Sequence, residues 1–162
     1  MLLIVECIVL CIIFTLMILP VQYKDPISMI MSYPPNVIKR VEQLPQYEGC
    51  IKEREKKHIS KKIFGVFFFA VLLAAVAYFS GCRGFIDTFF HVFMLFFAVN
   101  MYDMLVLDWG IFCHSKKLRI PGTEDMDKEY KDYLFHLKGA MKGTVIGIIV
   151  ASLSSLIMLV VI

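Results

Sequence analysis

Four long apolar stretches constrain this chain more than any other feature of its sequence. They cover about residues 2–21, 63–80, 85–112 and 143–162, and a helix of roughly 20 apolar residues crosses the hydrocarbon core of a bilayer. Within lipid, every backbone polar group needs an internal partner, which a helix supplies. We therefore expect an all-α integral membrane protein, an antiparallel four-helix transmembrane bundle with short cytoplasmic helical extensions, in one domain over residues 1–162.

The composition favours the same class of protein. Hydrophobic residues make up 59% of the chain and charged residues 19%, with a mean hydropathy of +0.72, whereas a soluble domain is about 45–50% apolar. The basic residues flank the apolar stretches instead of forming one basic surface, so we expect the lipid bilayer, and no nucleic acid, as a partner. The first stretch lacks the basic start and the cleavage site of a signal peptide.

The distribution of lysine and arginine predicts the orientation. All but one lie in the segments 22–62 and 113–142, and the connection 81–84 holds only Arg83. Because cytoplasmic loops carry an excess of these residues, we expect both segments in the cytoplasm and both termini outside the plasma membrane. The residues are Lys24, Lys39, Arg40, Lys52, Arg54, Lys56, Lys57, Lys61 and Lys62 in the first loop, and Lys116, Lys117, Arg119, Lys128, Lys131, Lys138 and Lys142 in and after the second.

Both loops contain signals for short helices. The apolar residues of segment 37–44 share one helical face, which indicates an amphipathic helix lying either on the inner membrane surface or against the ends of the bundle. In the second loop we expect Thr123 to cap a helix whose first turn holds the acidic residues of segment 124–127. Pro20 is expected to help end the first apolar helix.

The third apolar stretch carries most of the polar residues, with Asn100, Asp103 and Asp108 toward its cytoplasmic end. An ionisable residue at the middle of a bilayer costs about 2.5–3.5 kcal/mol, so something should offset that cost. On an ideal helix Asp103 and Asp108 lie about 60° and about 80° to either side of Asn100, and the three residues form one polar face. Asp87 and His91 lie nearly opposite, toward the outer end.

Cations that could pair with this face are scarce. Lys142, at the inner end of the fourth stretch, is the best counter-ion for Asp103 or Asp108, and Arg119 is the next. Such a pair would either hold the third and fourth helices together or belong to a substrate or ion site. Snorkelling of the carboxylates to the inner surface is the third alternative.

Motifs for other chemistry are lacking. The five cysteines Cys7, Cys11, Cys50, Cys82 and Cys113 include no CxxC pair. Several residues of metal-ligating type could converge near the inner surface, but no fixed ligand spacing supports a metal, so we predict neither a metal nor a cofactor. Those residues are Asp108, His114, Glu124, Asp125 and His136.

The fourth stretch carries a small residue at every fourth position, a pattern that lets another helix approach closely. The approaching helix belongs either to the same chain or to a second molecule. This small-residue ridge consists of Gly139, Gly143, Gly147, Ala151 and Ser155.

These features fit two classes of function. The first is a non-catalytic accessory, assembly or regulatory subunit that acts by helix association, with another membrane protein or as a homo-oligomer. The second is a small membrane enzyme or carrier acting on a lipid or lipophilic anion at the inner leaflet through Asn100, Asp103 and Asp108. A cavity that reaches Asn100 and Asp103 favours the second class, and a dry, paired contact there favours the first.

Overall fold

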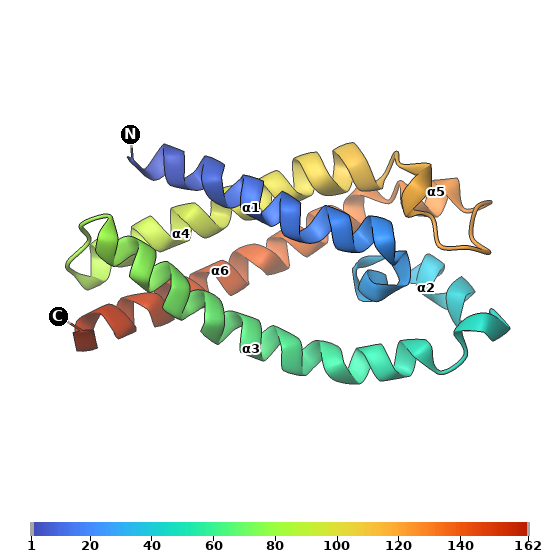
Figure 1. Ribbon diagram of the computed structural model, residues 1–162, viewed down its shortest axis with the longest axis horizontal. Helices are drawn as coiled ribbons and strands as arrows, with labels where there is room; N and C mark the ends of the chain where they lie inside the picture. The colour runs from blue at the N-terminus through green and yellow to red at the C-terminus, as the bar shows by residue number, and fades with distance from the viewer. Residues whose placement is uncertain (1, 162) are drawn as a thin grey trace.

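The computed structural model describes residues 2–161, without the side chains of Glu53, Lys56, Lys57 and His58. Within this range the chain forms helices joined by short turns (Figure 1). Four helical segments are long and apolar enough to cross a membrane, which confirms that part of the prediction. They are α1 (Leu2–Lys24), α3 (Cys50–Phe79), α4 (Phe85–Tyr102) continued by the π-helix η3 (Asp103–Phe112), and α6 (Tyr133–Val161).

Two helix boundaries differ from the prediction. The α1 helix runs through Pro20 to Lys24, so the expected end at this proline is wrong. Proline removes only one intrahelical hydrogen bond, and the remaining bonds continue the helix. The α6 helix begins at Tyr133, well before residue 143, because hydropathy marks the apolar part of a helix and not its amphipathic start. The predicted ends at residues 1 and 162 lie outside the described residues.

The short connection between α3 and α4 places these helices next to each other. Gly81 has a φ of +94°, which glycine adopts without strain, and the Cys82 amide donates to the Ala77 carbonyl at 3.0 Å. In Figure 1 this turn lies at the same end of the molecule as Leu2 and Val161. The short helices α2 (Pro35–Glu42) and α5 (Asp127–Tyr130) lie at the opposite end.

The long helices share an apolar core that we call the bundle core. The α4 helix packs against α6 and α1, and α6 also packs against α3. The α1 helix contributes only partly buried side chains, among them Leu3 and Leu10. The fully packed members are Ala70, Leu73 and Ala77 of α3, Val92 and Leu95 of α4, and Val150, Ala151 and Met158 of α6.

The two loops pack on each other in a second core, which we call the loop core. Val37 and Val41 of α2 are fully buried in it, so of the two expected positions for this helix the packed one is correct. The Tyr33 hydroxyl donates to the Leu118 carbonyl at 3.1 Å, and burial raises the pKa of Tyr33, so the phenol keeps its proton. The core is built from η1 (Pro26–Ser32), α2, η2 (Pro45–Tyr47), the first turn of α3, the end of η3, η4 (Lys116–Leu118) and α5.

The expected N-cap in the second loop is wrong. The Thr123 hydroxyl donates to the Ile120 carbonyl at 2.7 Å and therefore closes a turn. The next helix, α5, has no side-chain cap, and α6 is capped by Asp132, whose Oδ1 accepts the Phe135 amide at 2.9 Å. The carboxylate of Glu124 accepts the Gly122 amide at 2.9 Å. Residues 124–126 therefore fold as a loop, and Asp127 begins the short helix α5.

Candidate functional site

A polar contact joins α1 to α4 near the end where the chain begins. Glu6 Oε2 of α1 lies 2.9 Å from His91 Nε2 of α4, and the two side chains are only 15% and 12% exposed. Ser80, directly after α3, donates its hydroxyl to the other oxygen of Glu6. A carboxylate in apolar surroundings is costly unless it is paired and hydrogen-bonded, and here one imidazole and one hydroxyl supply both. Sequence reasoning missed this contact.

A second polar contact joins the same two helices further along. The Thr15 and Tyr102 hydroxyl oxygens lie 2.8 Å apart. Because the Thr15 hydroxyl donates to the Cys11 carbonyl at 2.8 Å, Tyr102 must be the donor in the contact between the helices. Polar side chains therefore join α1 to α4 at two places, through the close contact of Glu6 with His91 and the hydrogen bond between Thr15 and Tyr102.

Asn100 holds α4 against α6. Its Nδ2 donates to the Ala140 carbonyl at 2.9 Å and lies 3.2 Å from the Thr144 hydroxyl. Gly143 leaves the space for this side chain, because a Cβ there would overlap Asn100 Oδ1. The amide of Asn100 is therefore used in a contact between two helices.

The small-residue ridge of α6 faces α4 of the same chain over most of its length. A Cβ on Gly147 would approach Phe96 Cδ1 to 2.7 Å, and Ala151 and Ser155 are completely buried. Gly139 differs from the other four, since nothing lies within 4 Å of the Cβ position and the residue is exposed. Close packing within the chain, one of the two alternatives for the ridge, thus accounts for Gly143, Gly147, Ala151 and Ser155.

The π-helix η3 brings three polar residues onto one side. Its hydrogen bonds join residues five apart, as in the bond from the Cys113 amide to the Asp108 carbonyl at 2.9 Å. Residues 103, 108 and 113 therefore lie on nearly the same side of the π-helix, whereas an ideal α-helix would place them on different sides. Asp108 Oδ2 lies 3.0 Å from His136 Nδ1 of α6, and the His136 side chain is 3% exposed. The Cys113 thiol also lies beside this imidazole.

Neither expected counter-ion pairs with Asp103 or Asp108 among the described side chains, so those pairings are wrong. Arg119 pairs with Asp127 at 3.3 Å and lies with its guanidinium carbon 3.9 Å from the centre of the Tyr130 ring. Lys142 is exposed and forms no ion pair with any described side chain. Lys142 lies two residues after Ala140, and residues two apart point to different sides of a helix, so Lys142 faces away from α4. The basic side chain that contacts Asp108 is His136.

Other residues weighed as metal ligands lie in separate contacts. His114 Nδ1 is 2.9 Å from the Trp109 carbonyl and its Nε2 is 3.4 Å from the Tyr133 hydroxyl. Asp125 lies 3.9 Å from Arg40 in an exposed contact. These residues therefore do not gather around Asp108 and His136.

Polar residues of the long helices thus form one cluster of Glu6, Ser80 and His91 and another of Asp103, Asp108, Cys113 and His136, and Asn100 lies between the two along the chain. The predicted site residues Asn100 and Asp108 both contact α6, but Arg119 and Lys142 do not join them. Comparison of this chain with known protein families, with curated proteins and with solved structures gives no match.

Proposed function

We propose that the four apolar helices cross the plasma membrane as an antiparallel bundle, with both termini outside and the loops 22–62 and 113–142 in the cytoplasm. The lysine and arginine distribution supports this orientation. The arrangement in Figure 1 is compatible with it, since the ends of the described chain and the α3–α4 turn lie together, away from both loops.

We further propose that the protein is an accessory, assembly or regulatory subunit that acts by helix association. The observation that carries this proposal is the use of the intramembrane polar groups. Asn100 is bonded to Ala140 and Thr144, Asp108 is in contact with His136, and Glu6 is in contact with His91 and accepts a hydrogen bond from Ser80. Two open depressions on α3 touch neither Asn100 nor Asp103. These polar groups hold helices together, as expected for a dry, paired contact.

The helix with which the protein would associate is α1. It touches the bundle core only with partly buried side chains, and its opposite face exposes Val5, Ile8, Ile12 and Leu16 at 54–68%. A helix that is attached through a few polar contacts and has one exposed apolar face is suited to a lateral contact with another membrane protein. In lipid, close packing and hydrogen bonds drive such helix association.

A photo-crosslinking amino acid at Ile12, in the native membrane, tests this function. We expect a specific crosslinked protein, identified by mass spectrometry, and no such product from the same probe at Val160 near the end of α6, which is 88% exposed. A product containing only a second copy of the chain would assign the face to a homo-oligomer. Crosslinks to lipid alone would contradict the proposal.

A second function has one specific observation in its favour. The π-helix places Asp103 and Asp108 on the side of His136, and π-helical turns occur frequently at functional sites. A proton or ion carrier, or an enzyme acting at the inner leaflet, could use Asp103, which forms no ion pair with a described side chain. Asp103→Asn would then abolish a membrane activity, such as proton uptake by vesicles, without lowering the stability of the fold. An unchanged activity in that variant would remove this second function.

A further inference from the structure

Three aromatic side chains gather where η3 ends and α6 begins. Trp109 Nε1 donates to the Tyr133 carbonyl at 3.3 Å, and the two rings meet edge to face with their centroids 5.6 Å apart. His114 contacts both residues. We call Trp109, His114 and Tyr133 the aromatic cluster, and these contacts hold its rings together at the loop end of the bundle.

The aromatic cluster is open to its surroundings. Tyr133 is 40% exposed, His114 is exposed and Trp109 is half-buried. Tryptophan and tyrosine are enriched where a membrane meets water, because each has an apolar ring and a polar N–H or O–H group. The cluster therefore has the composition of an interfacial contact, and its depth decides whether it forms one.

The length of α6 gives that depth. The helix runs over 29 residues from Tyr133 to Val161, which is about 44 Å at 1.5 Å per residue. A bilayer with both headgroup layers is about 40–45 Å thick. A helix of this length has one end at each surface of the membrane, so Tyr133 and its neighbour Trp109 belong at the surface on the loop side.

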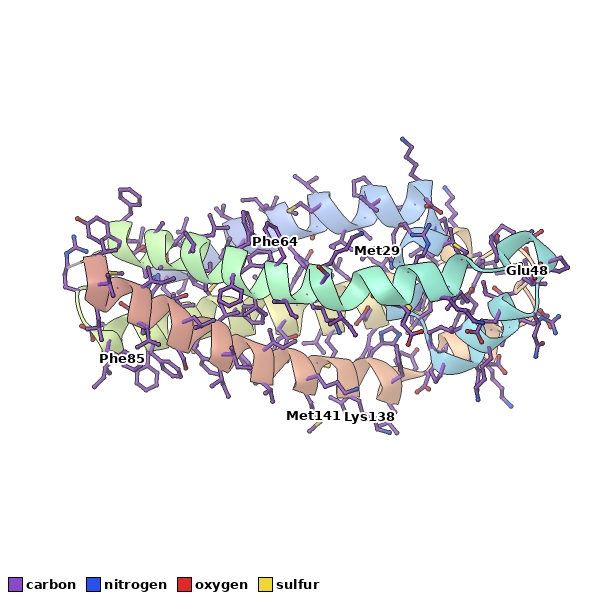
Figure 2. All side chains as sticks on the ribbon, turned by 90° about the horizontal axis from the view of Figure 1, so that it is seen from below. Met29, Glu48, Phe64, Phe85, Lys138 and Met141 are labelled. Carbon is purple, nitrogen blue, oxygen red and sulfur yellow. The ribbon has the colours of Figure 1, made fainter. Side chains whose placement is uncertain are left out.

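The charges of α6 indicate the same boundary. No charged residue follows Lys142 in this helix. Lys138 and Lys142 are exposed, and Figure 2 shows Lys138 next to Met141 on the outer side of α6. Lysines near the end of a membrane helix extend their ammonium groups to the interface. The hydrocarbon therefore ends near these two lysines, and Tyr133, about 8 Å before Lys138, falls in the headgroup layer.

We propose that the aromatic cluster lies in the lipid headgroup layer at the loop end of the bundle, which on the proposed orientation is the cytoplasmic leaflet. This inference rests on the proposed membrane bundle and not on helix association. Asp108 directly precedes Trp109 and contacts His136, so the same depth brings that contact to the membrane surface. A headgroup or a solute from the adjacent water, and not an acyl chain, would then reach Asp108.

Trp109 is the single tryptophan of the chain, so its fluorescence measures the depth of the cluster directly. The full chain is placed in phosphatidylcholine liposomes that contain lipids brominated either near the headgroup or near the end of the acyl chain. Bromine quenches only a tryptophan that it approaches closely. We expect the largest loss of Trp109 emission with bromine near the headgroup and the smallest with bromine at the chain end.

The matched control moves the tryptophan along the lipid-exposed side of α6. Trp109→Phe with Ile149→Trp uses a residue that is 48% exposed and lies about 24 Å along the helix from Tyr133. The order of quenching should be reversed in this variant. Circular dichroism confirms that it keeps the helix content of the unchanged protein.

The other results would overturn the proposal in distinguishable ways. Strongest quenching of Trp109 by bromine at the chain end would place the cluster within the hydrocarbon. Quenching of the control variant alone would place the cluster in water. If neither protein is quenched, the chain does not enter the bilayer, and the proposed membrane bundle fails together with this inference. Because both leaflets contain the same lipids, an error in the proposed orientation does not affect the result.

Discussion

Glu6 and His91 are joined at 2.9 Å between the first and third long helices, with Ser80 bonded to the same carboxylate. Replacing either residue strands its partner in apolar surroundings, so Glu6→Gln and His91→Gln should each lower the free energy of unfolding. In a double-mutant cycle we expect a coupling of about 1–2 kcal/mol, at the upper end for polar contacts between membrane helices. Unfolding in mixed detergent micelles measures it.

The control for this pair is Asp87→Asn, which changes an exposed carboxylate one turn from His91 on the same helix. It should leave stability within about 0.5 kcal/mol of the unchanged protein. Strictly additive effects of the Glu6 and His91 changes would mean that the two groups do not interact in the folded protein.

Two glycines of α6 make a matched test of the packing ridge. Gly147→Ala should destabilise the protein by about 1–3 kcal/mol, because its Cβ would press on Phe96. Gly139→Ala meets open space and should stabilise it by about 0.5–1 kcal/mol through the better helix propensity of alanine. Thermal unfolding in detergent compares the two variants. Equal effects of the same sign would show that the ridge does not pack against α4.

The two carboxylates near His136, Asp103 and Asp108, should differ in what their loss does to stability. Asp108→Asn removes the charge that is bonded to His136 and should cost about 2 kcal/mol, as loss of a hydrogen bond between charged groups does. Asp103→Asn should be neutral or stabilising, because it removes a shielded charge that has no cation partner among the described side chains. Chemical denaturation of both variants compares their free energies of unfolding. A larger loss for Asp103→Asn would place the important pairing at that residue instead.

Cysteines at the two ends of α3 test the proposed orientation. With the other cysteines replaced, a membrane-impermeant maleimide added to whole cells should label Cys82 after α3 and should not label Cys50 at its start. Burial raises the pKa of the Cys82 thiol. The reactive thiolate is therefore scarcer at neutral pH, and labelling should increase as the pH rises toward about 9. Labelling of Cys50 in intact cells, with no labelling of Cys82, would show that the orientation is the reverse of the proposed one.

Hydropathy predicted the four long helices, and the turn residues predicted the connection at Gly81. A long apolar stretch is restricted to a helix in lipid because its backbone polar groups need internal partners. The end of the third stretch at residue 112 and the tight turn at Gly81 both agree with the structure. Packing of α2 against protein was only one of two alternatives, since an amphipathic segment can bury its apolar face in lipid or in protein, and its contact with the second loop was not predicted. The spacing of the apolar residues in α2 is the same whether they face lipid or protein, so the sequence does not distinguish the two.

The site was less predictable, for two physical reasons. The π-helix changes which residues share a side, so the angles of an ideal helix misplace Asp108 relative to Asn100. The contact between Glu6 and His91 could have been found by depth. Glu6 follows the start of α1 by four residues and His91 the start of α4 by six, counted from Leu2 and Phe85. If both helices start at the same surface, these two polar groups lie at similar heights.

The loop core has a consequence for synthesis of the chain. Tyr33 donates to a carbonyl that lies 85 residues later in the sequence, and a ribosome adds those residues in about 4–17 s at 5–20 residues per second. During that interval Val37 and Val41 have emerged without the residues that later bury them. On the proposed orientation the nearest apolar phase is then the membrane surface, and an amphipathic helix such as α2 can bind there. Binding of α2 to the membrane surface, which the folded protein replaces by the loop core, would therefore keep the apolar face of the nascent chain from aggregating.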